Sequence, residues 1–525
     1  MKILVADDFS EKGLDVLAKG KVDFDVKTKL SEKELCGIIG GYDGVIVRSG
    51  AKITKKVILA ALRLKVIGRA GVGLDNVDVE SATEHGILVM NTPGGNTIST
   101  AEHTMSMMLA LARNIPQANA SIKQGKWERK NFMGVELFNK VLGVIGVGRI
   151  GSETARRSAA FGMKVLGYDP YIRAETVARI GMELVELPEL LSKADFITVH
   201  VPFTADTKNL ISKEQFGLMK KGVRIINCAR GGIIDENALY DALKQGIVAG
   251  AALDAFDEEP PDGSPLLGLD NVIATPHLGA STEEAQVGVS VDIAEQMLDY
   301  IKCGIVRNAV NLPFVEPETY EDLRPYFRLS EKMGALASQF IDGRIRQVRI
   351  FCSGEDIAEH SQMITSALLK GLLDPVIKDN INYVNAPLMV RKRGIKVIES
   401  KSSQAEDYSN LLRIELESDK GRTEIEGTLF GKTDPKIVRI DKYRVEISPE
   451  GDMLLCLHRD TLGVVGRIGT ILAGAGINIA AMTLGREKRG GKELTAVSVD
   501  EEADKATVEK IKTIKDMLEV KQVKL

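Results

Sequence analysis

The stretch Val141–Gly151, VLGVIGVGRIG, decides the fold. Its first residues are apolar and partly β-branched, which predicts a buried parallel strand, and its glycines have the spacing G-x-G-x-x-G where the strand should turn into a helix. In this pattern Gly146 permits a tight turn, Gly148 lets the backbone approach a pyrophosphate, and Gly151 allows close packing of helix and strand. The positive end of the helix would hold the anion. The stretch therefore predicts a dinucleotide-binding unit.

An acidic residue ends the next predicted strand. Asp169 lies in MKVLGYDP, Met163–Pro170. A carboxylate at this position accepts hydrogen bonds from the adenosine ribose hydroxyls and disfavours a 2′-phosphate. We therefore expect the cofactor to be NAD rather than NADP.

The composition restricts the class of protein. A chain of 525 residues is too long for one hydrophobic core, and 44% apolar with 27% charged residues is ordinary for a globular protein. The net charge of −4 argues against a general nucleic-acid binder. The five cysteines are scattered without a C-x-x-C motif, so neither a metal site nor a disulfide framework is expected. The N-terminal MKILVADDFS is no secretion leader, and no run is apolar enough to span a membrane, so a cytoplasmic location is expected.

Strands and helices alternate on both sides of the glycine-rich stretch. Short apolar strands alternate with amphipathic helices over residues 1–97 and again from about Lys140 to Pro276. Such alternation predicts parallel sheets with helices on both faces, and so two doubly wound α/β lobes. A helical run over 282–302 is expected to cross back to the first lobe, which makes that lobe discontinuous. The catalytic cleft is expected between the lobes.

The remainder of the chain has a different pattern. Val310–Pro325 carries prolines and acids and is typical of a linker. Residues 348–449 mix helices with strands, and residues 451–525 follow the ferredoxin-like order strand, helix, strand, strand, helix, strand. We therefore expect two α+β domains after the two lobes. The expected domain boundaries are 1–98 with 286–313, 99–285, 314–450 and 451–525.

Three side chains follow successive strands of the second lobe, where open α/β sheets bind ligands. Arg230 lies in NCARGGIID, Glu259 in DAFDEEP and His277 in TPHLGAST. A guanidinium fork can hold an α-keto-carboxylate through two hydrogen bonds. An imidazolium at His277 would donate a proton to the carbonyl as hydride arrives, and a buried Glu259 carboxylate would orient the ring. Each residue alone fits a structural role, but the three together predict a hydride-transfer enzyme.

These motifs together resemble the D-isomer-specific 2-hydroxyacid dehydrogenases. The resemblance rests on the glycine-rich stretch with Asp169 and on NCARGGIIDE, ALDAFDEEP and TPHLGASTEEAQ. With RAGVGLDNVD, WERKNFMG and the C-terminal unit, it extends to the long-form members, which carry an intervening domain and an ACT domain. It implies that Arg230, Glu259 and His277 form the catalytic set.

The resemblance implies further contacts with NAD. Arg149 and Ile150 would lie over the pyrophosphate, and Asp254 would face the nicotinamide carboxamide. The other cofactor residues that it implies are Cys228, Ala229, Arg230, His277, Gly279 and Ala280.

For the substrate, the resemblance implies NAD-dependent oxidation of 3-phospho-D-glycerate to 3-phosphohydroxypyruvate, the first step of L-serine biosynthesis. It leaves room for a side activity between 2-hydroxyglutarate and 2-oxoglutarate. Besides Arg230 and His277, the implied substrate residues are Arg48, Ser49, Arg69 and Gly73 in the first lobe, and Arg129 and Lys130 in a basic loop. That loop would contact the phosphate of a substrate bound to a neighbouring subunit. The alternative is that it is a solvent-exposed basic loop without a binding role. A homotetramer, or at least a homodimer, is expected.

The C-terminal unit resembles an ACT domain, a regulatory module for small ligands. His458, Asp460 and Asn478 match positions that bind serine in the family, so L-serine is the expected effector. Asp460 and Leu462 stand where some members carry Asn and Pro. We expect Asp460 and Asn478 on adjacent strand-end loops, so that two units side by side share one ligand.

Two other functions stay open. One is a D-2-hydroxyacid dehydrogenase of the glyoxylate or lactate type on the same scaffold. The other is a non-catalytic NAD-sensing scaffold, which would keep the same three side chains. Formate enzymes of this fold carry Gln in place of the glutamate, so Glu259 argues against formate.

Overall fold

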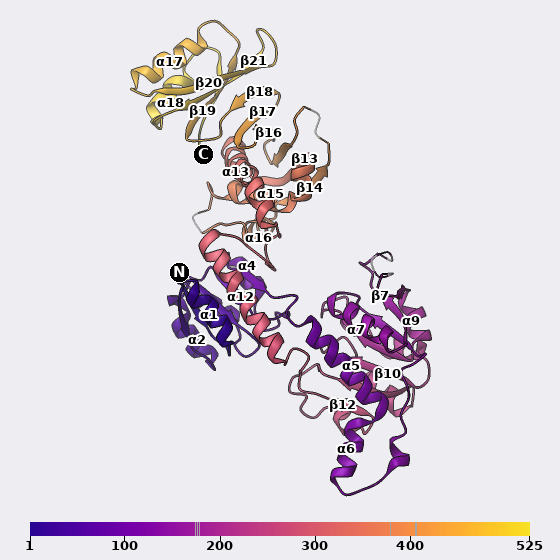
Figure 1. Cartoon of the computed structure of the whole chain (residues 1–525). Coiled ribbons are helices and arrows are strands. Elements are labelled where there is room, and N and C mark those ends of the chain that lie inside the picture. The colour runs from indigo at the N-terminus through magenta and orange to yellow at the C-terminus, as the bar shows by residue number, and fades with distance from the viewer. Residues whose placement is uncertain (174, 176, 178, 378–379, 405–406) are drawn as a thin grey trace. The chain divides into compact units, whose positions relative to one another are not determined.

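The computed structural model describes residues 1–173, 175, 177, 179–377, 380–404 and 407–525 (Figure 1). These residues divide into two compact units. Unit 1 comprises Met1–Asp8, Val16–Asn91 and Ile293–Leu525, and unit 2 comprises Phe9–Asp15 and Thr92–Asp292. Among the described residues, none of the helices combines the length and the apolar character that crossing a membrane requires.

The first sheet of unit 1 is parallel, with the order β2-β1-β3-β4-β5. Its strands are β1 (Lys2–Val5), β2 (Asp23–Val26), β3 (Gly44–Val47), β4 (Val66–Arg69) and β5 (Leu88–Asn91). The helices of this part of the chain are α1 (Glu11–Lys19), α2 (Glu32–Ile38), α3 (Lys55–Ala60) and α4 (Val79–Glu84). The central strands are buried at nearly every residue, as expected for a parallel sheet that is covered on both faces.

The sheet of unit 2 is also parallel, with the order β12-β11-β10-β9-β6-β7-β8. Its strands are β6 (Val141–Ile145), β7 (Lys164–Tyr168), β8 (Met182–Leu184), β9 (Phe196–Val199), β10 (Val223–Asn227), β11 (Val248–Leu253) and β12 (Val272–Ala274). Its principal helices are α5 (Thr97–Arg113), α6 (Ile115–Lys123), α7 (Arg149–Ala160), α9 (Leu187–Lys193), α10 (Lys213–Leu218) and α11 (Glu236–Lys244). The strand order reverses direction between β6 and β9, which is the topological switch point where such sheets bind ligands.

The helix α12 (Glu283–Cys303) agrees closely with the predicted helical run over 282–302. The helix α5 is rich in methionine, and its Met105, Met107 and Met108 are buried, so these residues belong to the hydrophobic core.

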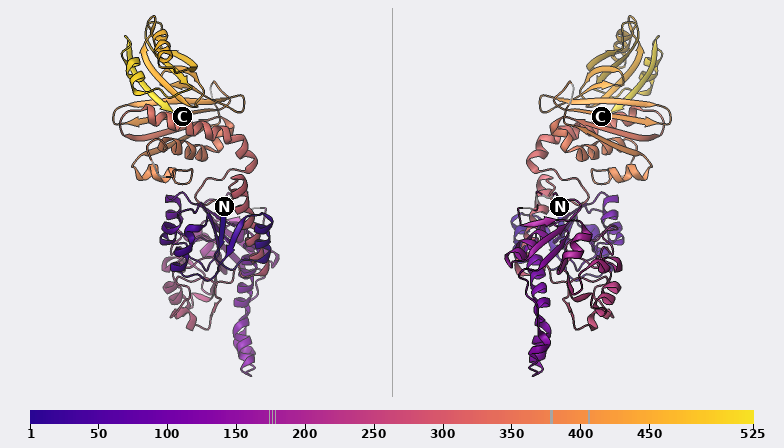
Figure 2. Two further views of the ribbon diagram at one scale, coloured as in Figure 1. Left: turned by 90° about the vertical axis from the view of Figure 1, so that its left-hand side faces the viewer. Right: turned by 90° about the vertical axis from the view of Figure 1, so that its right-hand side faces the viewer.

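The third sheet is mixed, with the order β14-β13-β15-β16-β17-β18. Its strands are β13 (Ile345–Ser353), β14 (Lys396–Ser402), β15 (Leu411–Ser418), β16 (Arg422–Phe430), β17 (Asp434–Ile440) and β18 (Tyr443–Ile447). The helices α13 (Pro317–Phe340), α14 (Glu355–Glu359), α15 (Ser361–Leu373) and α16 (Ala386–Lys392) belong to the same part of the chain. Because the long helices cover one face (Figure 2), every second residue of β15 is buried.

The linker is shorter than the sequence predicts. Pro317 opens α13, which continues to Phe340, so the part of the predicted linker from Pro317 to Pro325 is helical. A proline at the first turn costs no hydrogen bond, because the first N–H groups of a helix have no partner within it. Pro325 lies inside the helix, which persists because Leu323, Phe327 and later residues pack into the core of the third sheet.

The fourth sheet is antiparallel, with the order β20-β21-β19-β22. It is built from β19 (Asp452–Arg459), α17 (Val464–Gly474), β20 (Ile479–Arg486), β21 (Lys492–Val499), α18 (Lys505–Lys512) and β22 (Met517–Lys524). Helices and strands share a core that includes Leu454, Ile468 and Ile511. Two parallel α/β sheets, a mixed sheet and a ferredoxin-like sheet confirm the predicted fold class. The domain boundaries stay a prediction.

Candidate active site

The glycine-rich loop joins β6 to α7. Gly146 has φ +90°, and a Cβ added there would lie 2.7 Å from the carbonyl oxygen of His200. A Cβ on Gly151 would lie 2.1 Å from the carbonyl oxygen of Gly146, so only glycine lets the helix approach the strand this closely. Gly148 directly precedes α7, and a Cβ there would meet nothing within 4 Å. The space over the positive end of α7 is therefore open to an anion.

Asp169 follows β7 and lies beside this loop. Its Oδ2 accepts a hydrogen bond from the N–H of Val147 at 3.0 Å, and its Oδ1 accepts one from the N–H of Tyr171 at 3.0 Å. Each carboxylate oxygen keeps a second lone pair. Asp169 is thus held in place and can still accept ribose hydroxyls. Arg149 and Ile150 are the first residues of α7, adjacent to the open space.

We expect Asp169→Ala to reduce the preference for NAD over NADP. The variant loses the hydrogen bonds that the ribose hydroxyls would donate to the carboxylate, and a bond to a charged group is worth about 1.5–3 kcal/mol. The ratio of kcat/KM with NAD to kcat/KM with NADP should therefore fall roughly ten- to hundredfold. The ratio is the informative quantity, because the lost bond to Val147 loosens the loop for both cofactors. Steady-state kinetics with NAD and NADP provide the check, and an equal loss with both would contradict the assignment.

Arg230 lies on the loop after β10, and a buried side chain shapes that loop. Asn227 donates from Nδ2 to the carbonyl oxygen of Arg230 at 2.9 Å, and its Oδ1 accepts from the N–H of Ala229 at 3.0 Å. Nη1 of Arg230 donates to the carbonyl oxygen of Ala229 at 2.7 Å. The guanidinium is half-buried at the carboxyl end of the sheet. Burial raises the pKa of the neighbouring Cys228 to about 12, so this thiol stays protonated.

His277 and Glu259 form a direct pair. Nδ1 of His277 lies 2.9 Å and 3.0 Å from the two carboxylate oxygens, and Oε1 of Glu259 also accepts from the N–H of Phe256 at 3.2 Å. With Nδ1 as the donor, Nε2 is the ring nitrogen left to exchange a proton with a ligand. The side chains are 43% and 41% exposed, so the expectation of a buried carboxylate is wrong for this structure. Both belong to loops beyond the strand ends, and loops lie at the surface.

Asp254 holds the backbone next to His277, which adopts a left-handed conformation with φ +54°. Oδ1 of Asp254 accepts from the N–H of Leu278 at 2.7 Å, and Oδ2 accepts from the N–H of Gly279 at 2.8 Å. Oδ1 also accepts from the hydroxyl of Thr275 at 2.6 Å. Burial alone would raise the pKa of Asp254, but its hydrogen bonds outweigh burial and lower it. An ionised Asp254 thus fixes the loop that presents His277.

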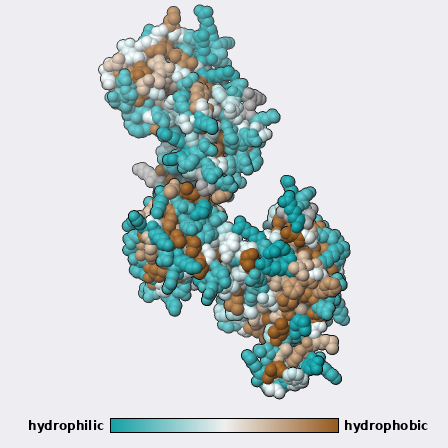
Figure 3. Space-filling view, in the orientation of Figure 1, coloured by the Kyte–Doolittle hydropathy of each residue, from teal (hydrophilic) through white to brown (hydrophobic). Residues whose placement is uncertain are grey.

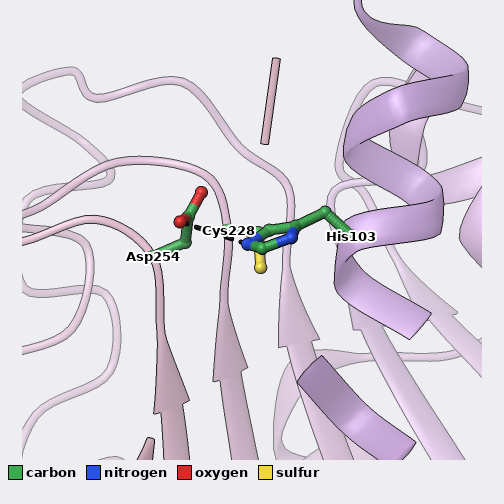
Figure 4. A group of neighbouring side chains, drawn as sticks. All are labelled: His103, Cys228 and Asp254. Carbon is green, nitrogen blue, oxygen red and sulfur yellow. Dashed lines mark ion pairs between the residues drawn. The ribbon is translucent and has the colours of Figure 1, made fainter. Parts of the chain in front are cut away.

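The sequence analysis did not single out His103. Figure 4 shows its ring, on α5, pointing toward Asp254, and Nε2 lies 3.1 Å from Oδ1. The ligand atoms of His103, Cys228 and Asp254 lie within 4.8 Å of one another. The carboxylate already has four donors and the thiol stays protonated, so this is a hydrogen-bonded cluster. The partners are far apart in sequence, so no motif signals them.

The predicted substrate residues lie in both units. Arg48 and Ser49 follow β3, Arg69 ends β4, and Gly73 follows in the next loop, all in unit 1. Gly71, at φ +140°, leaves room for the guanidinium of Arg69, because a Cβ there would lie 1.6 Å from its Nη1. The remaining predicted residues, Arg129, Lys130, Arg230 and His277, lie in unit 2. Arg129 and Lys130 are exposed on the 3-10 turn Arg129–Phe132.

The predicted effector residues do not come together within one chain. His458 is fully buried, and its two ring nitrogens lie 2.8 Å from the hydroxyl of Thr495 and from the carbonyl oxygen of Arg459. Asp460 follows the end of β19 that pairs with the start of β21, whereas Asn478 precedes β20 where Ile479 faces Val499. The two residues lie at opposite ends of the sheet, so the expectation of adjacent loops is wrong. Because β19 and β20 both pair antiparallel with β21, they run in the same direction, and the end of β19 lies far from the start of β20.

Three family patterns match the chain. "D-isomer specific 2-hydroxyacid dehydrogenase, NAD binding domain" matches residues 105–279, "D-3-phosphoglycerate dehydrogenase intervening domain" matches 322–441, and "ACT domain" matches 453–516. The first confirms the NAD-binding prediction for unit 2.

The chain is also similar to curated proteins and solved structures. It is 47% identical to the D-3-phosphoglycerate dehydrogenase of Archaeoglobus fulgidus, over 100% of both chains, and 41% identical to that of Bacillus subtilis, over 100% of this chain and 99% of the other. The crystal structure of the TT0316 protein from Thermus thermophilus is 34% identical, with a TM-score of 0.55, over 59% of this chain and 100% of that one. A D-lactate dehydrogenase from Aquifex aeolicus, complexed with NAD and lactic acid, is 29% identical, with a TM-score of 0.52, over 60% of this chain and 100% of that one.

Proposed function

Because the chain belongs to the D-3-phosphoglycerate dehydrogenase family, we propose that its described sites carry out the NAD-dependent oxidation of 3-phospho-D-glycerate to 3-phosphohydroxypyruvate, the first step of L-serine biosynthesis. The observation that carries this assignment is the His277–Glu259 pair. It lies beyond the carboxyl ends of the strands in the sheet that also bears the glycine-rich loop. Spectrophotometric assay of NADH formation with 3-phosphoglycerate, D-lactate and D-glycerate tests it. Turnover of D-lactate in preference to the phosphorylated acid would overturn the substrate assignment.

The residues divide the chemistry among them. The glycine-rich loop and α7 would hold NAD, which would supply the acceptor for the hydride from C2 of the substrate. Nε2 of His277 takes the hydroxyl proton, and the Glu259 carboxylate stabilises the imidazolium that forms. The guanidinium of Arg230 holds the substrate carboxylate through two hydrogen bonds. In the reverse direction His277 returns the proton to the carbonyl oxygen.

The remaining site residues are part of the same proposal. The open space over Gly148 and the carboxylate of Asp169 support NAD binding by the glycine-rich loop and α7. We assign the same cofactor role to Arg149, Ile150, Cys228, Ala229, Asp254, Gly279 and Ala280. We assign substrate binding to Arg48, Ser49, Arg69 and Gly73, because they lie at or near the carboxyl ends of parallel strands. The four domains with the boundaries given above complete the proposal.

Exposed apolar side chains on one segment of unit 2 support self-association. Ile122, Trp127, Met133 and Phe138 are 53%, 78%, 84% and 62% exposed. Figure 3 shows hydrophobic surface at the end of this unit that carries α6. Surfaces of this kind mark interaction sites. We propose that the segment pairs two subunits and brings Arg129 and Lys130 toward a neighbouring active site. The assembly would be a dimer at least, and a tetramer as the sequence predicts.

All five cysteines are unpaired, which fits the proposed cytoplasmic location.

The separation of Asp460 and Asn478 supports serine binding between two ACT domains. The strand β20 lies at the edge of its sheet. Two-fold pairing of such edges runs the strands antiparallel, which brings Asp460 of one subunit beside Asn478 of the partner subunit. The ligand would then favour one arrangement of the subunits, and inhibition would be allosteric.

We expect Asn478→Ala to weaken inhibition by L-serine without changing turnover in its absence. The variant removes a side chain that meets the ligand only in the proposed dimer. Inhibition curves measured beside Glu509→Ala, an exposed substitution on α18, provide the control. An unchanged inhibition constant would place the effector site elsewhere. Point variants are preferable to deleting residues 452–525, because Met453, Leu455 and Leu494 share one core with the third sheet.

A further inference from the structure

The segment Arg48–Ala51 lies where ligands bind in sheets of this topology. The order β2-β1-β3-β4-β5 reverses direction between β1 and β3, so the crevice at the carboxyl ends of these two strands is the topological switch point. The segment directly follows β3. It carries Arg48 and Ser49, which the proposed function places at the substrate. Two side chains contact its backbone: Asp7, which follows the neighbouring strand β1, and Asn76, which lies in the loop after β4, the neighbouring strand on the other side.

Asp7 binds the N–H groups of the segment. Its Oδ2 accepts hydrogen bonds from Arg48 at 2.7 Å, Gly50 at 3.2 Å and Ala51 at 2.9 Å. The backbone of the segment therefore forms a turn in which three N–H groups point toward one carboxylate oxygen. A Cβ on Gly50 would lie 2.5 Å from Oδ1 of Asp7, so any larger residue here would have to displace this carboxylate.

Asn76 binds the carbonyl groups of the same segment. Its Nδ2 donates to the carbonyl oxygens of Arg48 and Ala51, both at 2.6 Å. The backbone carbonyl of Asn76 accepts from the N–H of Ile53 at 2.8 Å, which fixes Asn76 against the continuation of the segment. An acceptor on one side and a donor on the other therefore determine the shape of Arg48–Ala51.

We propose that Asp7 and Asn76 are positioning residues that set substrate affinity by holding Arg48 and Ser49 in a fixed geometry. The proposal rests on the proposed substrate role of these two residues. Because Asp7 accepts from the N–H groups of Arg48, Gly50 and Ala51, these three groups are not available to an anion, and the side chains of Arg48 and Ser49 are the groups that the turn presents. A preorganised binding group loses less freedom when the ligand binds, so releasing the backbone weakens binding.

The decisive experiment compares KM values for 3-phosphoglycerate and NAD in the full-length enzyme. Asp7→Ala removes three hydrogen bonds to a charged acceptor, and we expect the KM for 3-phosphoglycerate to rise about tenfold or more. The KM for NAD should not change. Asp7→Asn should recover much of the affinity, because an amide oxygen can accept the same N–H groups. Asn76→Asp is nearly isosteric but sets a carboxylate against two carbonyl oxygens, so it should raise the same KM selectively.

A matched control separates positioning from general loosening. Asp78 accepts from the N–H of Ser81 at 2.9 Å and caps α4 in the same part of unit 1, without a contact to Arg48–Ala51 among its hydrogen bonds. Asp78→Ala should lower stability but leave the KM for 3-phosphoglycerate unchanged. Should Asp7→Ala fold poorly, Gly50→Ala carries the test in its place, because a methyl at Gly50 displaces the carboxylate.

The outcomes distinguish the proposal from its premise. If Arg48→Ala raises the KM for 3-phosphoglycerate while Asp7→Ala and Asn76→Asp behave like Asp78→Ala, the positioning role is wrong and the substrate role stands. If Arg48→Ala leaves that KM unchanged, the substrate role fails and the positioning proposal fails with it. Equal increases in the KM for 3-phosphoglycerate and for NAD would indicate general loosening and would also overturn it.

Discussion

His277→Asn is expected to lower kcat by about 10²–10⁴-fold, because a general acid–base group contributes that much to a proton transfer. His277 adopts φ +54°, a conformation that asparagine tolerates better than alanine, so the variant should keep the loop in place. The hydrogen bonds from Leu278 and Gly279 to Asp254 do not involve the ring and should persist. The loss should therefore appear in turnover while the dissociation constant for NAD stays the same.

The measurement combines steady-state kcat with direct titration of NAD. Glu259→Gln is the matched comparison, because it keeps an acceptor for Nδ1 but removes the negative charge that stabilises the imidazolium. Its kcat should fall by less than that of His277→Asn. A turnover above a tenth of the unsubstituted rate in His277→Asn, with NAD binding retained, would remove His277 from the proton transfer.

Features governed by nearby residues were predictable from the sequence. The glycine-rich loop is one of them, because the positive φ of Gly146 and the close approach of Gly151 to the carbonyl oxygen of Gly146 arise within the motif itself. The ferredoxin-like unit is another, since its strands and helices follow one another with short connections. The order of Arg230, Glu259 and His277 after successive parallel strands placed them at one edge of the sheet before the structure was known.

Features that depend on distant residues were not predictable. His103 meets Asp254 across a long stretch of chain, and neither residue type nor spacing signals the pair. The continuation of α13 past Pro325 depends on packing against the third sheet, which outweighs the local cost of proline. The separation of Asp460 and Asn478 follows from the direction of the strands, because β19 and β20 both pair antiparallel with β21 and therefore run the same way, which the residues around either position do not reveal.

Arg230→Lys is expected to lower kcat/KM for 3-phosphoglycerate by about 10²–10⁴-fold, although the positive charge remains. Two charge-assisted hydrogen bonds to one carboxylate are worth about 3–6 kcal/mol together, and an ammonium cannot reproduce the planar fork that makes both. The backbone contacts from Asn227 fix the loop without the guanidinium, so the fold and NAD binding should survive the substitution. Kinetics with 3-phosphoglycerate and titration with NAD check both parts. Arg230→Gln, which removes the charge as well, should be more impaired than Arg230→Lys. Equal activity of Arg230→Lys and the unsubstituted enzyme would show that the carboxylate is held by another cation.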